Sequence, residues 1–264
     1  MKNIIIYCGW DLKFDLYHDK QIELYVDQVP TTPIPEDVIR FVFLLEPPEI
    51  IDYSAHALNG LHNNTYNYLL THNQELIDSS DKAHLFEFGM TWIKDYTFPD
   101  KEFSVSALVG GKLMAEGHRL RQDVLTNRSR ITTPKNFHIS SHYPPKVDSL
   151  GLKILGDNKM PLFDSQYHIC IENTKRLNWF TEKLIDCMMT KTIPIYWGCP
   201  NIGNWFNLDG IIMVNNLEDI ISVCNSLNED TYNEKLNAIN ENYELGLKLA
   251  TIDDRLINKI KELI

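Results

Sequence analysis

The chain has 264 residues, a length that suits one large domain or two small ones and that allows a substantial buried core. Hydrophobic residues make up 44% of it, and 12 glycines and 12 prolines are spread along it, which excludes a disordered, collagen-like or coiled-coil protein. The chain contains 25 Lys and Arg residues and 36 Asp and Glu residues, so its formal net charge is −11. The surface as a whole therefore repels nucleic acid and anionic membranes, and an anionic ligand must bind at a local basic site.

The cysteines and the start of the chain bear on its compartment. Five cysteines are widely spaced and include no C-x-x-C pair, so the sequence indicates neither a zinc site nor a disulfide framework. The apolar run at residues 1–7 is too short for a signal sequence and has the pattern of a first strand. No window approaches the roughly 20 apolar residues of a membrane span. We therefore expect a cytoplasmic protein with no membrane span.

Short apolar runs alternate with polar stretches of helical character in the first part of the chain. Four runs have the composition of buried strands: 4–7, 41–45, 66–70 and 84–88. This spacing is typical of βαβ units and favours an open parallel sheet over a sandwich. The turn residues at 98–101 separate this block from the next, and we interpret them as a linker.

A second block follows the linker and has the pattern of a parallel sheet. Its predicted elements are a strand at 103–109, a helix at 113–124, a strand at 167–172, a helix at 181–190 and a strand at 192–197. The tail, 232–264, repeats apolar residues at helical spacing, so we expect helices that pack on the sheet. The two blocks predict two domains, 1–99 and 100–264.

Polar residues follow the predicted strand at 167–172, and ligands of open parallel sheets bind beyond such strand ends. The next helix begins near Thr181, where free backbone N–H groups and the helix dipole favour an anion. Lys183 in the first turn costs its own helix about 0.3–1 kcal/mol, and a bound phosphate would explain its presence. From spacing alone, the alternative stays open that Thr181 is a simple N-cap and Lys183 extends into solvent.

The densest positive patch on this acidic chain contains Arg119 and Arg121, with Lys112 and His118 nearby. The planar fork of an arginine suits a diphosphate. Taken alone, however, a helix with a few arginines is more often a solvated face. The patch is therefore a candidate anion site only in combination with other evidence.

The sequence predicts no metal site. His138 and His142 are four residues apart and could share a metal on a helix, but the residues around them favour ordinary loop histidines. No D-x-D pair follows a predicted strand. We therefore do not expect a divalent cation that bridges a nucleotide diphosphate.

Glu46 and Glu49 flank two prolines directly after the predicted strand at 41–45. A carboxylate held at a strand end by stiff prolines can act as a general base if partial burial raises its pKa toward neutrality. Without further evidence, this spacing favours an ordinary surface turn.

Three ordered segments lie close together in the second block. They are HICIENT at 168–174, WFTEKLID at 179–186 and TIPIYWGCPNI at 192–202. Together they closely resemble the donor-binding motif of the family-10 glycosyltransferases, the α-1,3/4-fucosyltransferases, in their bacterial form. A weaker similarity continues upstream, at 66–72 and 103–124.

The resemblance implies an α/β protein with a GT-B-like fold, in which two Rossmann-like domains with parallel sheets face each other across a cleft. The domain at 1–99 would bind the acceptor, and the domain at 100–264 would bind the nucleotide-sugar donor. It implies an enzyme that needs no cofactor and no metal, and that transfers fucose from GDP-fucose, with inversion, to a hydroxyl of an acceptor glycan. The alternatives are a related enzyme with another nucleotide sugar, such as a xylosyl donor, and a non-catalytic carbohydrate- or nucleotide-binding protein on the same fold.

The resemblance also implies roles for individual residues. The donor-binding residues would be Arg121 or Arg119, Glu172, Asn173, Trp179, Thr181, Glu182 and Lys183. Of these, Lys183 and the arginine would neutralise the diphosphate, and Glu182 would bind ribose hydroxyls or the sugar. Trp179 takes the place of a tyrosine that contacts the nucleotide, and Glu172 with Asn173 would shape the loop. The general base would be Glu46 or, as second choice, Glu49.

Overall fold

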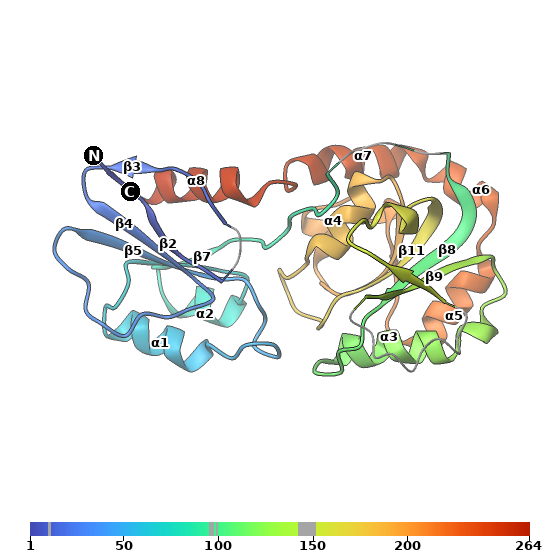
Figure 1. Cartoon of the computed structure of the whole chain (residues 1–264), viewed down its shortest axis with the longest axis horizontal. Coiled ribbons are helices and arrows are strands. Elements are labelled where there is room, and N and C mark those ends of the chain that lie inside the picture. Colours follow the sequence, from blue (N-terminus) through green and yellow to red (C-terminus); the bar gives the residue numbers. More distant parts are fainter. Residues whose placement is uncertain (10–11, 95–97, 99, 142–151) are drawn as a thin grey trace. The chain divides into compact units, whose positions relative to one another are not determined.

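The computed structural model describes residues 1–9, 12–94, 98, 100–141 and 152–264. The chain forms two compact units, which Figure 1 shows in sequence colours. Unit 1 comprises Met1–Phe88, Leu177–Trp179 and Ile252–Ile264, and unit 2 comprises Gly89–Arg176 and Phe180–Thr251. This division differs from the predicted 1–99 and 100–264, because two later segments pack with the first sheet and because residues 89–99 count with unit 2.

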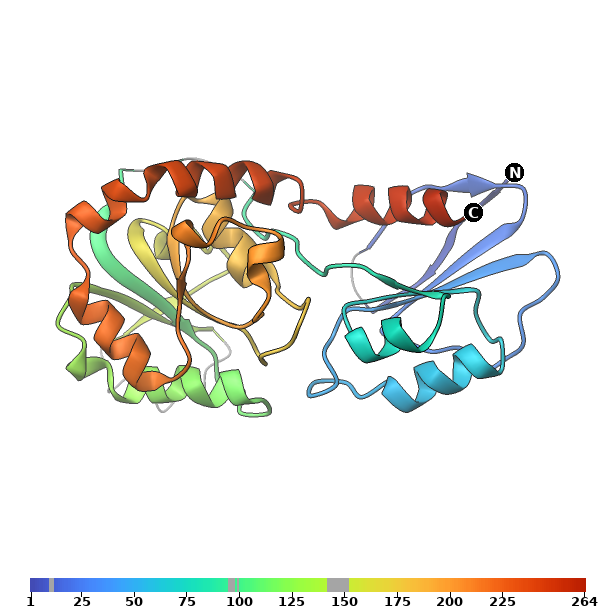
Figure 2. The ribbon, with the colours of Figure 1, turned by 180° about the vertical axis from the view of Figure 1, so that it is seen from behind.

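Unit 1 is built on a five-stranded parallel sheet in the order β2-β4-β5-β6-β7. Its strands are β2 (Ile5–Tyr7), β4 (Gln21–Val26), β5 (Val38–Leu44), β6 (Tyr68–Thr71) and β7 (Ala83–Leu85), and a short antiparallel pair joins β1 (Lys2–Asn3) to β3 (Tyr17–His18). Helices α1 (Ser54–His62) and α2 (Gln74–Ser79) cover one face, and α8 (Ile252–Leu263) lies on the other (Figures 1 and 2). Buried side chains of β5, β6, α1 and α2 form one core cluster.

The predicted strands of unit 1 are largely confirmed. Those at 4–7, 41–45 and 66–70 correspond to β2, β5 and β6, whereas the strand predicted at 84–88 ends at Leu85. Strand β4 was missed because its residues alternate between half-buried and buried instead of forming an apolar run. The predicted alternation with helices is wrong before β5, since the described part of 8–37 contains strands and loops only.

Unit 2 is built on a six-stranded parallel sheet in the order β10-β9-β8-β11-β12-β13. Its strands are β8 (Glu102–Val109), β9 (Lys135–Ser140), β10 (Lys153–Leu155), β11 (Ser165–Ile171), β12 (Ile193–Trp197) and β13 (Ile212–Met213). Two strands thus run outward on one side of β8 and three on the other, the doubly wound order in which the chain reverses direction between β8 and β11. The carboxyl ends of β8 and β11 therefore form the topological switch point, where a crevice opens in such sheets.

Helices cover both faces of the unit 2 sheet. Helices α3 (Glu116–Thr126) and α5 (Leu217–Ser226) lie on one face, and α4 (Glu182–Met189) and α7 (Leu236–Leu247) lie on the other, with α6 (Glu229–Glu234) between α5 and α7 in the chain (Figure 2). One apolar cluster packs β11 and β12 against α3 and α5, and a second packs them against α4. Strand β11 is consequently buried along its whole length, as its continuous apolar sequence predicts.

Several predictions for the second half of the chain are confirmed. The helix predicted at 181–190 is α4 with Thr181 as its N-cap, and the strands at 103–109, 167–172 and 192–197 are β8, β11 and β12. His138 lies in β9 and not in the predicted loop, and His142 lies outside the described residues. Both units are α/β with an all-parallel main sheet, which confirms the predicted fold class.

The last helix corrects a further prediction, because α8 belongs to unit 1 and not to the sheet of the second block. Leu256 and Ile260 are fully buried, and the Arg255 guanidinium donates hydrogen bonds to the carbonyls of Glu87 and Phe88, both at 3.2 Å. Amphipathic spacing shows that one face of a helix is covered, but it does not show by which sheet. Among the described helices, none combines the length and the apolar character that crossing a membrane requires.

Candidate functional site

Glu172 is the first residue after β11 and lies at the switch point of the unit 2 sheet, with its side chain fully buried. Its carboxylate accepts hydrogen bonds from the Thr181 N–H at 2.8 Å and from the Thr181 hydroxyl at 2.7 Å. Thr181 in turn caps α4 by accepting from the Lys183 N–H. The anion expected at the start of this helix is therefore a carboxylate of the chain itself, in the position that the helix dipole favours.

Two glycines allow neighbouring elements to approach Glu172. A Cβ atom at Gly117, in the first turn of α3, would lie 1.8 Å from the Glu172 carbonyl oxygen. The Gly117 N–H also donates to the Asn173 carbonyl at 2.9 Å. At Gly198, directly after β12, a Cβ would lie 2.7 Å from Glu172 Cγ. Gly117 thus lies against the backbone at Glu172 and Asn173, and Gly198 lies against the Glu172 side chain.

Lys183 lies beside this carboxylate. Its Nζ donates to Thr181 Oγ1 and Glu182 Oε1, both at 3.0 Å, and lies 3.6 Å from Glu172 Oε2. Burial alone would lower the pKa of Lys183, but the carboxylates of Glu182 and Glu172 together raise it. The ammonium is therefore charged, and 23% of the side chain remains exposed. The alternative in which Lys183 extends freely into solvent is wrong.

The structure separates the two candidate arginines. Arg121 is half-buried, and its guanidinium donates to the Ile171 carbonyl at 3.2 Å and to Asn173 Oδ1 at 2.7 Å. Arg119 is exposed, and its guanidinium donates to the Leu113 carbonyl at 3.2 Å. Arg121 is thus the arginine held at the end of β11, and Arg119 occupies the solvated face that helix spacing suggested.

The surroundings of His118, in the first turn of α3, are strongly positive. The imidazole is buried, and its Nδ1 accepts a hydrogen bond from the Ala115 N–H at 3.1 Å. Burial lowers its pKa to about 4, with further lowering by the positive charges of Arg121, Lys112 and Lys183 and, last, of Arg119. A neutral histidine among four cations marks a local basic site on a chain of net charge −11.

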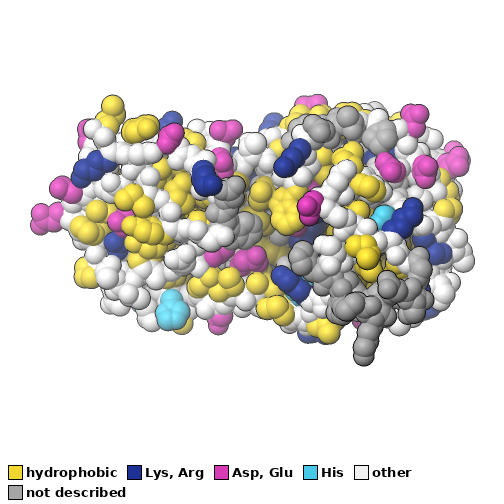
Figure 3. Space-filling model, viewed as in Figure 1, with side chains coloured by type: hydrophobic (Ala, Val, Ile, Leu, Met, Phe, Trp, Pro, Cys, Tyr) yellow, Lys and Arg dark blue, Asp and Glu magenta, His cyan; other side chains and the backbone are white. Residues whose placement is uncertain are grey.

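The wider charge distribution contrasts with this local cluster. On the face shown in Figure 3, the described Lys and Arg side chains are interspersed with Asp and Glu, and they form no broad field of one sign. This face therefore carries charges of both signs side by side.

Glu182 and Asp186 lie one turn apart on α4 and are both buried. Burial by itself would raise the pKa of Glu182, but Lys183 and Lys159 lower it to about 2, so this carboxylate only accepts hydrogen bonds. Asp186 accepts from the Thr91 hydroxyl and the Trp92 N–H, both at 2.8 Å, and pairs with Lys159 at 3.1 Å. Sequence reasoning missed Asp186, although an acidic residue among apolar neighbours in a helix was a usable signal.

Trp179 belongs to another unit than the other predicted donor-binding residues. It belongs to unit 1, where it is almost fully buried and its Nε1–H donates to the Leu45 carbonyl at 3.0 Å. The preceding residue, Asn178, has a φ of 60° and donates to Gln74 Oε1 at 2.8 Å, which ties this segment to unit 1. The predicted contact of Trp179 with a nucleotide stays a prediction.

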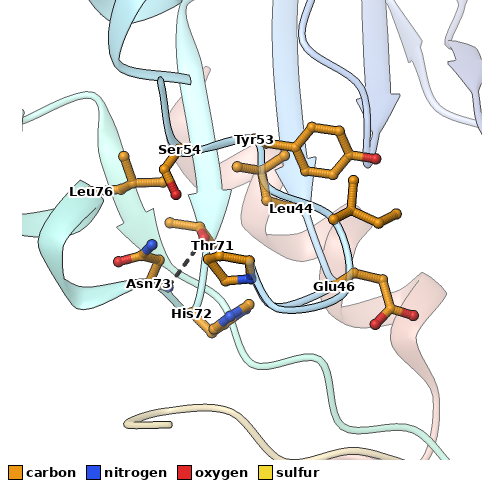
Figure 4. A pocket seen from close by; sticks show the side chains of 10 residues that line it. Leu44, Glu46, Tyr53, Ser54, Thr71, His72, Asn73 and Leu76 are labelled. Carbon is orange, nitrogen blue, oxygen red and sulfur yellow. Dashed lines mark hydrogen bonds between the residues drawn. The ribbon is translucent and has the colours of Figure 1, made fainter. Parts of the chain in front are cut away.

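Unit 1 has a small hollow at the carboxyl ends of β5 and β6 (Figure 4). Its lining comprises Leu44, Glu46, Pro48, Ile51, Tyr53, Ser54, Thr71, His72, Asn73 and Leu76. The hollow is thus lined by a carboxylate, two hydroxyls besides the tyrosine, an imidazole and an amide, together with apolar side chains. Glu46 lines this hollow and is half-buried, whereas Glu49 is exposed in the following turn and is not part of the lining.

Two further ionisable residues lie near Glu46. Asp27, directly after β4, accepts hydrogen bonds from the Leu45 and Glu46 N–H groups at 2.8 and 3.1 Å. Burial raises the pKa of Tyr53, and the negative charges of Asp27 and Glu46 raise it further. Tyr53 is therefore a neutral hydroxyl close to both carboxylates. Asp27 escaped sequence reasoning because β4 itself was missed.

No cluster that could hold a metal ion is evident in the described part of the chain, where no three His, Cys, Asp or Glu side chains converge suitably. The carboxylates of the unit 2 site instead have lysine and threonine partners. Independence from metal ions stays a prediction.

Comparison with known proteins places the chain among glycosyltransferase folds. No known family model matches it. A stretch of 72 residues, 27% of this chain, is 33% identical to the alpha-(1,3)-fucosyltransferase FucT of Helicobacter pylori. That match spans only 15% of the relative's length. The resemblance to bacterial fucosyltransferases is thus confirmed.

Similar solved structures extend the likeness to most of the chain. An alpha1,3-fucosyltransferase with GDP-fucose superposes with a TM-score of 0.53 at 17% identity, over 86% of this chain and 70% of that one. A trehalose-6-phosphate synthase, described for glycosyl transfer with retention, gives a TM-score of 0.57 at 11% identity, over 94% of this chain and 75% of that one. At such identities the likeness shows the fold, which is GT-B-like. Since one of these relatives acts with retention, the fold alone does not fix the stereochemistry of transfer.

The pKa of His118 tests the positive cluster. The pKa of about 4 lies below the ordinary 6.5, so the stability that neutral His118 contributes is present above pH 6.5 and is lost as the pH falls to about 4. Lys112→Met removes one of the nearby charges, and we expect the pKa of His118 to rise, as measured by NMR titration of its ring protons. Lys235→Met, on a lysine that is not among the charges acting on His118, serves as control. An unchanged pKa in Lys112→Met would place Lys112 away from the cluster.

Proposed function

We propose that this chain is a glycosyltransferase that moves fucose from GDP-fucose to a hydroxyl of an acceptor glycan, with inversion and without a metal ion. The observation that carries the proposal is the group of cations around His118, with Arg121 and Lys183 held beside buried Glu172 at the switch point of unit 2. The motif at 168–203, the match to a fucosyltransferase and the likeness to a structure that contains GDP-fucose support the choice of donor.

The donor half of the proposal uses the charges of unit 2. Arg121 and Lys183 neutralise the diphosphate, and their positions are preorganised by Asn173, Thr181 and Glu182. Fixed positive groups of this kind can stabilise the charge of a leaving group by several kcal/mol, which is the task a metal ion performs in other transferases. Glu182, with its pKa of about 2, accepts hydrogen bonds from ribose or sugar hydroxyls.

The acceptor half uses the hollow of unit 1. Tyr53, Ser54 and Asn73 offer hydrogen bonds to sugar hydroxyls, and Glu46 is the general base. The acceptor oxygen forms a bond to the anomeric carbon of the donor while the bond from that carbon to the diphosphate oxygen breaks. Glu46 takes the hydroxyl proton, and the nucleotide leaves with the bonding electron pair. Glu49 is the weaker candidate because it is exposed and outside the hollow.

Two alternatives remain open. Trp179 takes the place of a tyrosine that contacts the nucleotide in the family, and its indole is almost fully buried in unit 1. Another nucleotide sugar, such as a xylosyl donor, could use the same phosphate and ribose contacts. A non-catalytic protein that binds nucleotides or carbohydrates is the second alternative.

A donor screen followed by a transfer assay separates these alternatives. We expect GDP and GDP-fucose to raise the melting temperature more than UDP and UDP-sugars, since a ligand that binds the folded state stabilises it by mass action. Transfer to a panel of acceptor glycans should persist in EDTA and give the anomer opposite to that of the donor, as read by NMR. Stabilisation by every donor without transfer would favour the binding protein, and loss of transfer in EDTA would refute metal independence.

The two arginines form a matched pair for the donor site. Arg121→Ala removes a charge-assisted contact worth about 1.5–3 kcal/mol, so we expect the Kd for GDP to rise by about 10–100-fold. Lys183→Ala should weaken nucleotide binding and turnover similarly. Arg119→Ala, which removes the same side chain two residues away, should change the Kd by less than about threefold. Calorimetry measures the Kd for GDP of all three variants. Equal effects of Arg121→Ala and Arg119→Ala would contradict the assignment of Arg121 to the diphosphate.

The two glutamates form a matched pair for the base. Glu46→Gln keeps the shape of the side chain but cannot take a proton, so we expect transfer to fall by about 10²–10⁴-fold while the Kd for GDP is unchanged. Glu49→Gln should leave transfer within about threefold of the unaltered protein. If Glu49→Gln were the inactive variant, the role of base would pass to Glu49.

A further inference from the structure

Asp27 is a buried carboxylate of unit 1 to which the proposed reaction gives no role. It is 7% exposed, and it follows β4 with a φ of 50°, a left-handed conformation that aspartate tolerates better than most residues. Its backbone N–H donates to the Phe43 carbonyl at 2.9 Å, so its own position is fixed by β5.

The Asp27 side chain binds the backbone at Glu46, the proposed general base. Oδ1 accepts the Leu45 N–H at 2.8 Å and the Glu46 N–H at 3.1 Å. On the other side of the same peptide unit, the Leu45 carbonyl accepts the Trp179 Nε1–H at 3.0 Å. The peptide group between Leu45 and Glu46 is therefore held at its N–H by Asp27 and at its C=O by Trp179.

These bonds lie beyond the end of β5, so they add nothing to the sheet ladder. Asp27 Oδ2 is buried and has no hydrogen-bond partner among the described residues. Burial raises the pKa of Asp27, and the two backbone N–H groups only partly oppose that rise. A buried carboxylate with one oxygen unsatisfied is an unfavourable way to stabilise a turn, and such groups call for an explanation beyond stability.

The direction of a side chain depends on the peptide plane that precedes it. Rotation of the Leu45–Glu46 peptide changes the φ of Glu46 and so moves its carboxylate, and a misplacement of about 1 Å can cost about 100-fold in rate. We infer that Asp27 and Trp179 are positioning residues for Glu46, which clamp this peptide from both sides and aim the carboxylate at the acceptor hydroxyl. The inference rests on the proposed role of Glu46 as the base.

The clamp also gives Trp179 a function other than the one its sequence position implied. The indole is almost fully buried, lies 6.1 Å from the His72 ring between centroids, and contacts the turn that carries Glu46. His72 itself lines the hollow. Trp179 therefore acts on the acceptor side of the reaction, while Thr181, two residues later, belongs to the donor side.

The test compares turnover with donor affinity. Asp27→Ala and Trp179→Phe each remove one side of the clamp, and we expect kcat to fall by about 10–100-fold with an unchanged Kd for GDP. Asp27→Asn keeps an oxygen acceptor at this position and should restore kcat to within about threefold. Asn67→Ala is the matched control, since it removes a side-chain bond to the Arg40 N–H at the other end of β5 and should lower stability without lowering kcat.

A double-variant cycle separates positioning from a general loss of structure. If Asp27 acts through Glu46, Asp27→Ala should lower the residual rate of Glu46→Gln by less than twofold. An equal loss in both backgrounds, or a loss of kcat in Asn67→Ala as large as in Asp27→Ala, would overturn the inference.

Hydrogen exchange gives a readout that does not depend on activity. The amides of Leu45 and Glu46 should exchange faster in Asp27→Ala and remain protected in Asp27→Asn. Unchanged protection in Asp27→Ala would refute the clamp. The proposed function itself would fail if the unaltered protein transferred no sugar or if Glu46→Gln were fully active. If Glu46→Gln were inactive but Asp27→Ala fully active, only the positioning role of Asp27 would fail.

Discussion

The hydrogen bonds between the Glu172 carboxylate and the N-cap of α4 organise the switch point of unit 2. An isolated carboxylate in this position would be costly to bury, and the cost is met by Thr181, by the helix dipole and by Lys183. Once Glu172 is fixed, the end of β11, the start of α4 and the first turn of α3 have defined positions, because Gly117 and Gly198 allow contact with it from two sides. The strand order, which reverses between β8 and β11, places this arrangement where a ligand can reach it.

Carboxylates and lysines lie next to one another around the start of α4. Lys183 lies between Glu172 and Glu182, and Lys159 pairs with Asp186. Because each cation is held by a buried carboxylate, its position is set before any ligand arrives. This preorganisation is the physical basis on which a site of this kind could stabilise a departing diphosphate. The same principle recurs in unit 1, where a buried aspartate holds the backbone of Glu46.

Local sequence signals predicted unit 2 well, and non-local contacts account for what they missed. The buried strand before Glu172, the cap at Thr181 and the helix that follows are each encoded within a few residues, so they could be read directly. The separation of Arg121 from Arg119 depends on which helix face meets β11, and the location of Trp179 depends on a contact with Leu45 far earlier in the chain. Asp27 required knowledge of β4, whose alternating pattern is typical of a half-buried strand and was not recognised.

The interleaved assembly of the two units restricts how this protein can be divided. Unit 1 draws on Leu177–Trp179 and on Ile252–Ile264 in addition to the first part of the chain, so the polypeptide passes from one unit to the other four times. A fragment that stopped at the predicted linker would lack α8, and with it the cover over Phe86, whose ring packs edge-on against Phe43 and lies under the Arg255 guanidinium. It would also lack the indole that meets Leu45. Residues 1–99 expressed alone should therefore give an incompletely folded unit 1, and during synthesis unit 1 can be completed only after α8 has been made.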